Sequence, residues 1–282
     1  MLEQKQVNES ISPTAWTIAQ QRSLTDIPYS NQIFRVLERQ LSQNGVEISE
    51  EFRSPQIAPQ TEARYKLVDH LLRENGVQQV LEIASGFSPR GLQMTDNNNF
   101  VYVEVDLQNV LKQKRQIVKS IGRRENLHLE IGNALDINTL NAATKHLDPS
   151  KRLSIIHEGL LRYLNFDQKT QVARNIHSLL TKFNGVWITP DITLKKVVQA
   201  ENTVVPVTTD KVGKSIGINI DLNRFDDVDR AQTFFEGLGF SVERHRFTEV
   251  IDQLSSPEKL DQTRQEVEDL ICDAYVFVMR IA

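Results

Sequence analysis

Glycine and acidic residues stand at the ends of two neighbouring strand-like runs of this sequence. The first run, residues 80–84, leads into Ser85 and Gly86, and the second ends in Glu104-Val105-Asp106. A glycine lets the backbone pass close to a ligand, and a strand-terminal carboxylate can accept the hydrogen bonds of a ribose diol. The spacing predicts a binding site for an adenosine-bearing cofactor. The alternative is an ordinary strand-to-helix turn with a surface aspartate.

A third polar cluster follows the strand-like run 127–131. It contains Asn133, Ala134, Leu135 and Asp136. Asn133 or Asp136 could hydrogen-bond an adenine amino group while Leu135 packs on the ring. An Asn/Asp turn that caps the next helix explains the same residues equally well.

A fourth cluster, HEGLLRYL (residues 157–164), follows the run LSII. Its Glu158 would stand over the crevice, where a carboxylate facing a sulfonium or amino group is favourable in a partly dehydrated cleft. Alternatively, Glu158 caps the following helix and His157 is a hydrogen-bonded residue at the end of the sheet.

Strand-like and helical segments alternate from residue 77 onward. We expect strands at 79–84, 100–105, 127–131, 152–157, 184–189, 240–247 and 274–281, and helices at about 107–121, 137–146, 166–182 and 228–238. The alternation predicts an α/β fold, with helices on both faces of a doubly wound, seven-stranded, mostly parallel sheet. The last strand should pair antiparallel in the edge region. Ligands bind outside the carboxyl ends of the strands in such sheets, where all four clusters stand.

Helical patterns dominate the residues before this sheet. Helices are expected at 12–23, 31–43 and 61–75. We predict an N-terminal helical cap (1–75), with Trp16 and Tyr29 on the substrate side, and a cofactor-binding domain (76–282). Residues 192–227 read as an insertion, either beside the substrate or as a surface hairpin.

Composition excludes several classes of protein. The 282 residues are 39% hydrophobic and 25% charged with a net charge of −4, so nothing indicates electrostatic capture of nucleic acid or an anionic membrane. The single cysteine, Cys272, excludes an intrachain disulfide and is expected in the core. The scattered histidines predict no metal site. Without a signal peptide or an apolar run of ~20 residues, the chain is expected to be cytoplasmic and to have no membrane partner.

Taken together, the motifs resemble the leucine carboxyl methyltransferase-like family of class I S-adenosylmethionine-dependent O-methyltransferases. YVEVDL is similar to the family's E-V-D-L/F, HEGLLRYL to its A-E-G-L-L-M-Y-L, VLEIASGFSPRGL to its strand and glycine-rich turn, and Glu62-Ala63-Arg64 to its A-R segment. The resemblance implies a Rossmann-like fold and S-adenosyl-L-methionine as cofactor. It places Asp106 at the ribose, Glu158 beside the cofactor's amino acid, and Arg64 at its carboxylate.

The sequence departs from the family in two places. Where the family has G-A-G-x-D-T-R, this chain has A-S-G-F-S-P-R (residues 84–90), which lacks one glycine and the acidic residue. The family's adenine-side D-L pair corresponds to Ala134-Leu135, with Asn133 or Asp136 as substitutes. Cofactor binding there is therefore a hypothesis.

The implied activity is transfer of a methyl group to a carboxylate or hydroxyl of a small-molecule acceptor. A carboxylate needs no general base, whereas a hydroxyl needs one, and His157 and Tyr163 are the candidates. An NAD-dependent oxidoreductase would share the first strand, the turn and Asp106, but it predicts a G-x-G-x-x-G that is absent. A catalytically inactive cofactor-binding regulatory protein is the other alternative. The sequence predicts neither the acceptor nor the oligomeric state.

Overall fold

The structure is a computed structural model that describes residues 13–43, 45, 53–76, 78–195 and 223–282. One seven-stranded sheet crosses it in the order β3-β2-β1-β4-β5-β7-β6. The strands are β1 (Gln79–Ile83), β2 (Val101–Asp106), β3 (Leu127–Ile131), β4 (Leu153–His157), β5 (Val186–Thr189), β6 (Phe240–Arg246) and β7 (Tyr275–Ile281). The predicted doubly wound α/β fold is confirmed.

Strands β1 to β5 are parallel, and β7 pairs antiparallel with both β5 and β6. The final strand is thus antiparallel as expected, although β6 rather than β7 forms the edge. Strand β1 has β2 as its neighbour on one side and β4 on the other, so the strand order reverses at β1. This reversal creates a crevice at the carboxyl ends of β1 and β4, which is where open α/β sheets bind ligands.

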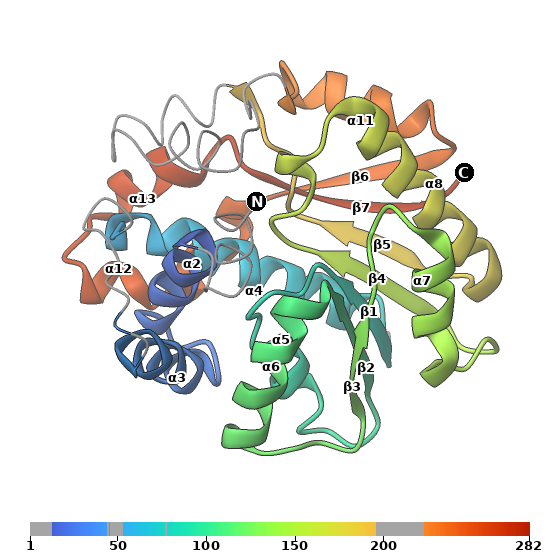
Figure 1. Cartoon of the computed structure of the whole chain (residues 1–282). Helices are drawn as coiled ribbons and strands as arrows, with labels where there is room; N and C mark the ends of the chain where they lie inside the picture. Colours follow the sequence, from blue (N-terminus) through green and yellow to red (C-terminus); the bar gives the residue numbers. More distant parts are fainter. Residues whose placement is uncertain (1–12, 44, 46–52, 77, 196–222) are drawn as a thin grey trace, which may run out of the picture.

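Helices cover both faces of the sheet (Figure 1). They are α2 (Pro13–Ser23), α3 (Ser30–Gln43), α4 (Ala58–Glu74), α5 (Arg90–Met94), α6 (Gln108–Ile121), α7 (Ile137–Ala143), α8 (Phe166–Phe183), α11 (Val228–Glu236), α12 (Ser256–Lys259) and α13 (Arg264–Ile271). Successive strand residues point to opposite faces, so Val80 belongs to a core with α2, α3, α4, α6 and α13, and Leu81 to one with α7, α8 and α11. None of the helices in the described ranges has both the length and the apolar character needed to cross a bilayer.

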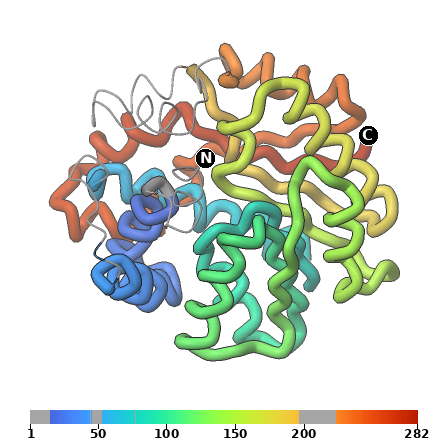
Figure 2. The backbone as a smooth tube through the Cα atoms, in the orientation of Figure 1, coloured from blue at the N-terminus to red at the C-terminus, as the bar shows by residue number. Residues whose placement is uncertain are grey.

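The N-terminal helices pack against the end of the chain, as the blue and red segments of Figure 2 show. Glu62 of α4 is fully buried, and its carboxylate accepts hydrogen bonds from the main-chain nitrogens of Ser255 and Ser256, both at 2.8 Å. Helix α4 therefore contacts elements on both sides of residue 75, and a domain boundary there remains a prediction.

One expectation about a side chain is wrong, because Cys272 does not lie in the core. Cys272 is exposed because it is the C-cap of α13, whose buried face carries Val267, Leu270 and Ile271.

Most of the expected insertion, residues 196–222, lies outside the described residues. Its two flanks meet, since the Lys195 nitrogen donates to the Phe225 carbonyl at 3.1 Å.

Candidate active site

The turn after β1 carries two residues with left-handed backbone. Ala84 has φ 53° and Gly86 has φ 51°. The Gly86 nitrogen donates a hydrogen bond of 2.7 Å to Asp106 Oδ2, which ties this turn to the end of β2. Ala84 occupies the position of the first glycine in the family motif. It has a left-handed backbone conformation, which glycine adopts more easily than alanine does.

Asp106 lies at the end of β2 as predicted. It is 9% exposed, and its carboxylate also accepts a hydrogen bond of 2.7 Å from the Leu107 nitrogen. Burial raises the pKa of Asp106, and the hydrogen bonds from Gly86 and Leu107 oppose that rise. A carboxylate has about four acceptor sites, so the two hydrogen bonds leave capacity for a ligand hydroxyl.

Glu104 lies on the same face of β2 as Asp106, and neither residue is among those that line the cavity described below. It is fully buried, and its Oε2 is 2.9 Å from the Lys114 ammonium. Burial raises the pKa of Glu104 to about 7 although the charge of Lys114 acts to lower it. We therefore assign Glu104 to a buried ion pair and no longer include it in the cofactor site.

The segment after β3 forms an Asn/Asp turn that caps the next helix, which is the predicted alternative to an adenine contact. Asn133 Oδ1 accepts from the Leu135 nitrogen at 3.0 Å, and Asp136 caps α7 through the Asn138 nitrogen. The Ala134 carbonyl accepts a hydrogen bond from the Asn175 side chain. The role of Asn133, Ala134 and Leu135 toward adenine stays a prediction.

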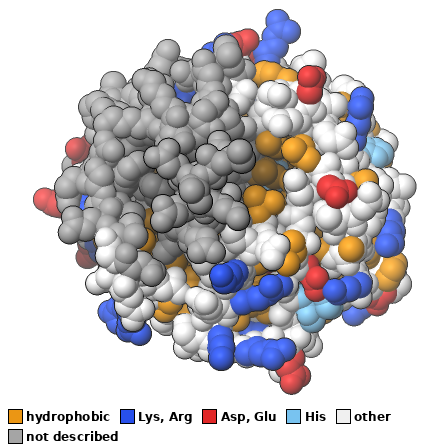
Figure 3. All heavy atoms as spheres, viewed as in Figure 1, with side chains coloured by type: hydrophobic (Ala, Val, Ile, Leu, Met, Phe, Trp, Pro, Cys, Tyr) orange, Lys and Arg blue, Asp and Glu red, His pale blue; other side chains and the backbone are white. Residues whose placement is uncertain are grey.

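The sequence reasoning missed two exposed apolar residues at these strand ends. Leu107 is 52% exposed and directly follows β2, and Ile131 is 47% exposed and ends the neighbouring β3. Figure 3 shows hydrophobic side chains exposed near the centre of the face seen there. Apolar surface at the carboxyl end of β2 and β3 can pack against a flat ring.

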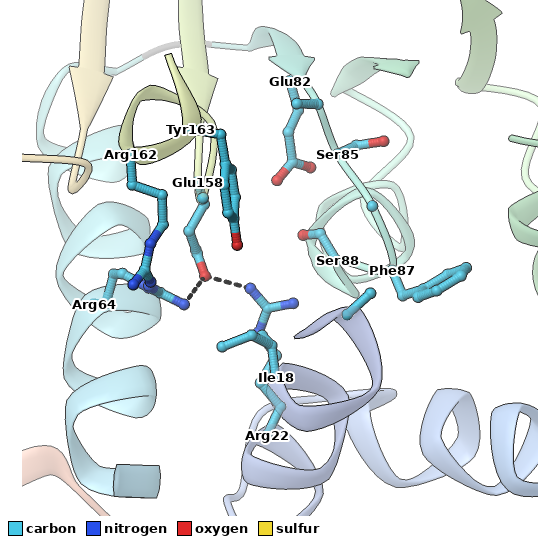
Figure 4. A pocket seen from close by; sticks show the side chains of 14 residues that line it. Ile18, Arg22, Arg64, Glu82, Ser85, Phe87, Ser88, Glu158, Arg162 and Tyr163 are labelled. Atoms are coloured by element: carbon cyan, nitrogen blue, oxygen red, sulfur yellow. Dashed lines mark hydrogen bonds and ion pairs between the residues drawn. The ribbon is translucent and has the colours of Figure 1, made fainter. Parts of the chain in front are cut away.

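A cavity of about 330 Å³ opens at the ends of β1 and β4. Among the residues lining it are the predicted Arg64, Ser85, Gly86, Glu158 and Tyr163 (Figure 4). Helix α2 contributes Ala15, Ile18 and Arg22, which share one face of the helix, rather than the expected Trp16. Trp16 is 1% exposed within the core, and the hydroxyl of Tyr29 bonds Asp96 instead.

Glu158 lies at the centre of the charges in this cavity. Its Oε1 pairs with the guanidinium groups of Arg22 and Arg64, the latter at 2.8 Å, and its Oε2 is 3.7 Å from Arg90. Burial acts to raise the pKa of Glu158, but the three arginines outweigh it and lower the pKa to about 2. The structure thus brings Arg64 and Glu158 together and adds Arg22, which sequence reasoning missed.

Arg90 belongs to a buried network behind the cavity. Its Nε donates to Asp69 at 2.6 Å, its Nη1 to Glu82 at 3.3 Å, and its guanidinium stacks over Tyr65 at 4.0 Å. Arg90 thus has two carboxylate partners of its own and lies farther from Glu158 than Arg64 does.

His157 does not line the cavity. It is 1% exposed, Trp187 donates to its Nε2 at 3.0 Å, and its Nδ1 is 3.0 Å from Asp191. Both ring nitrogens are therefore occupied, which contradicts the prediction of His157 as a general base. His157 matches the alternative of a hydrogen-bonded histidine at the end of the sheet. Tyr163 lines the cavity and remains a candidate.

Asp191, which sequence reasoning also missed, holds the turn that carries Glu158. Its carboxylate accepts hydrogen bonds from the main-chain nitrogens of Gly159, Leu160 and Leu161 at 2.6, 2.6 and 3.1 Å. Burial acts to raise the pKa of Asp191, but His157 and these backbone donors lower it well below its usual range. Asp191 follows the expected strand 184–189, so the rule that ligand sites lie at strand ends could have identified it.

Comparisons with known proteins point to one family. The family model for leucine carboxyl methyltransferase matches residues 12–177. No curated protein matches the sequence.

Similar solved structures have low sequence identity, and the first of the three that follow shares the fold. A candidate methyltransferase from Thermobifida fusca YX is 12% identical, with a TM-score of 0.57 over 97% of this chain and 96% of that one. A candidate O-methyltransferase from Nostoc punctiforme PCC 73102 is 15% identical, with a TM-score of 0.45 over 79% of this chain and 60% of that one. Magnesium protoporphyrin IX methyltransferase from Synechocystis PCC 6803, with bound SAH, is 10% identical, with a TM-score of 0.47 over 79% and 85%.

Proposed function

The chain belongs to the leucine carboxyl methyltransferase family and is an S-adenosylmethionine-dependent methyltransferase, and we propose that it methylates a carboxylate or hydroxyl oxygen of a small molecule. The family match removes the support for the oxidoreductase alternative. The proposal concerns the class of acceptor and the residues that hold the cofactor.

The observation that carries the proposal is the pairing of Glu158 with Arg22 and Arg64 inside the cavity. An α-amino acid presents an ammonium and a carboxylate side by side, and this cluster presents the complementary charges. Glu158 would accept hydrogen bonds from the ammonium, while Arg64 and Arg22 would bind the carboxylate. Charge-assisted hydrogen bonds of this kind are strongest in a partly dehydrated site.

Polar atoms left without partners fit the same ligand. The Nε atoms of Arg22 and Arg64 and the Oγ of Ser85 are buried and make no hydrogen bond within the described residues. A buried polar group without a partner costs about 1–3 kcal/mol. A ligand in the cavity can satisfy these atoms.

The adenosine end of the cofactor would lie along the ends of β2 and β3. We propose that Asp106 binds the ribose and that Leu107 and Ile131 pack on the adenine beside Leu135. Asn133 stays in this site as a proposed contact to the adenine edge. These assignments rest on strand-end position and exposure.

The bound cofactor supplies an activated methyl group on a sulfonium. This methyl group would pass to the acceptor oxygen, and the electron pair of the carbon–sulfur bond would remain on sulfur. This chain's residues would mainly fix the geometry, since collinear placement at near-attack distance accounts for much of such a rate enhancement. If the acceptor is a hydroxyl, Tyr163 is the candidate to accept its proton.

Calorimetric titration with S-adenosylmethionine, S-adenosylhomocysteine and NAD tests the proposal. We expect binding of the first two and none of NAD. Glu158→Gln should weaken S-adenosylhomocysteine binding at least tenfold, while Glu236→Gln, at the end of α11 on the surface, should bind as wild type. Release of S-adenosylhomocysteine in the presence of carboxylate and hydroxyl acceptors then tests turnover. Absence of binding to wild type would refute the cofactor site.

A further inference from the structure

Arg162 is a second place, besides the turn after β1, at which the lining of the cavity departs from the family motifs. In HEGLLRYL it occupies the position where A-E-G-L-L-M-Y-L has methionine. Its side chain lines the cavity and runs beside Glu158 toward Arg64 (Figure 4). A positively charged side chain thus lies in the cavity at a position where the family motif has an apolar one.

The other arginines near the cavity have carboxylate partners, and Arg162 has none among the described residues. Arg22 and Arg64 share Glu158, while Arg90 has Asp69 and Glu82. The Arg162 Nε is buried and makes no hydrogen bond within the described ranges. Its nearest aromatic contact is weak, with the guanidinium carbon 5.8 Å from the centre of the Tyr163 ring.

Binding of the cofactor would not neutralise the positive charge of Arg162. The methionyl ammonium and carboxylate would be bound by Glu158 and by Arg64 with Arg22, and the sulfonium adds one more positive charge. Like charges a few ångströms apart repel each other more strongly where water is largely excluded. A neutral acceptor would leave the charge of Arg162 without a counter-ion.

From these charges we infer that the acceptor is a small organic acid and that Arg162 binds its anionic group. The inference rests on the proposed function and specifies the acceptor of the same site. Ile18, Phe87 and the ring of Tyr163 also line the cavity, so the rest of the acceptor would be apolar. A guanidinium matches the planar geometry of a carboxylate, and an anionic partner satisfies both its charge and its free N–H groups.

The test uses a panel of small aromatic and aliphatic carboxylic acids, each paired with its neutral primary amide. Binding is measured calorimetrically on the full chain, both saturated with S-adenosylhomocysteine and without it. We expect at least one acid to bind ten times more tightly than its amide, with an affinity that falls as salt is raised. Arg162→Met, which restores the residue of the family motif, should weaken the acid at least tenfold and leave the amide unchanged within twofold. Arg162→Lys should retain part of the affinity, and Arg174→Met, at an exposed position of α8, should behave as wild type.

Two results would overturn the inference. One is a panel in which no acid binds more tightly than its amide, or in which Arg162→Met binds the acids as wild type does. The other is an Arg162→Met variant that loses affinity for S-adenosylhomocysteine rather than for the acids, which would place Arg162 in the cofactor site. Failure of wild type to bind S-adenosylhomocysteine would instead refute the proposed function, and the acids measured without cofactor would still decide the role of Arg162.

Discussion

The main-chain nitrogen of Gly159 donates a hydrogen bond of 2.6 Å to Asp191 Oδ1, across 32 residues of sequence. Gly159 follows Glu158 directly and has φ 80°, a conformation that glycine adopts readily. The turn brings the main-chain nitrogens of Gly159, Leu160 and Leu161 to the same carboxylate. Asp191 comes just after β5, whereas Glu158 comes just after β4, and the two strands are paired. One buried carboxylate thus fixes the direction in which another points.

Asp191→Asn should therefore affect both stability and cofactor binding. The amide keeps the size of the side chain but loses the charge that accepts three backbone hydrogen bonds and pairs with His157. We expect a fall of about 3 kcal/mol in the free energy of unfolding and roughly tenfold weaker S-adenosylhomocysteine binding, measured by urea denaturation and calorimetry. Asp269→Asn, on the exposed side of α13, is the control and should change stability by less than about 0.5 kcal/mol. A folded Asp191→Asn variant with wild-type affinity would show that Asp191 does not position Glu158.

Substitutions of Glu104 and Asp106 should have different effects although both residues belong to β2. The first should lower stability, and the second should weaken cofactor binding. Glu104→Gln leaves the Lys114 ammonium buried without a counter-ion, so the free energy of unfolding should fall by about 3 kcal/mol. It should be measured at pH 8, above the pKa of Glu104 of about 7. Asp106→Asn should instead weaken S-adenosylhomocysteine at least tenfold, because an amide donor replaces one acceptor oxygen. If Glu104→Gln lowers affinity as much as Asp106→Asn, excluding Glu104 from the site is wrong.

The sequence predicted the position of residues that stand at the ends of strands. Asp106, Glu158, Ser85 and Gly86 stand at strand ends, and strands are recognisable from short apolar runs, so the rule for open sheets was enough to bring them to one edge. The fold followed from the same alternation.

Residues whose role depends on packing between distant elements could not be predicted in this way. Arg22 reaches Glu158 across 136 residues only because α2 packs on α4. The sequence predicts Trp16 and Tyr29 on the substrate side, but α2 turns Ala15 and Ile18 toward the cavity and Trp16 into the core. Tyr29 lies outside α2, and its hydroxyl bonds Asp96. The partners of His157 likewise come from β5 and the turn after it, which no pattern around His157 reveals.

Glu158 should give the protein a specific dependence of stability on pH. Its pKa falls from 4.5 to about 2 in the folded state, so folded protein holds fewer protons there than unfolded protein. The stabilisation is fully present above pH 4.5 and is lost as the pH falls toward 2. Between pH 5 and pH 3 the free energy of unfolding of wild type should fall by about 2 kcal/mol more than that of Glu158→Gln. Urea denaturation at both pH values measures this difference, and Glu236→Gln should follow wild type; parallel pH profiles for wild type and Glu158→Gln would contradict the ion-pair assignment.

Ala84→Gly should stabilise the protein. Ala84 has φ 53°, a left-handed conformation that costs a non-glycine residue about 1–2 kcal/mol. Glycine removes this cost but makes the unfolded chain more flexible, which returns about 0.5–1 kcal/mol. The net gain should be up to about 1 kcal/mol by urea denaturation. Ala142→Gly, at an exposed helical position of α7, is the matched control and should lose about 1 kcal/mol, because it has only the entropic penalty. A loss of stability in Ala84→Gly as large as that in Ala142→Gly would show that the turn after β1 is not strained at Ala84.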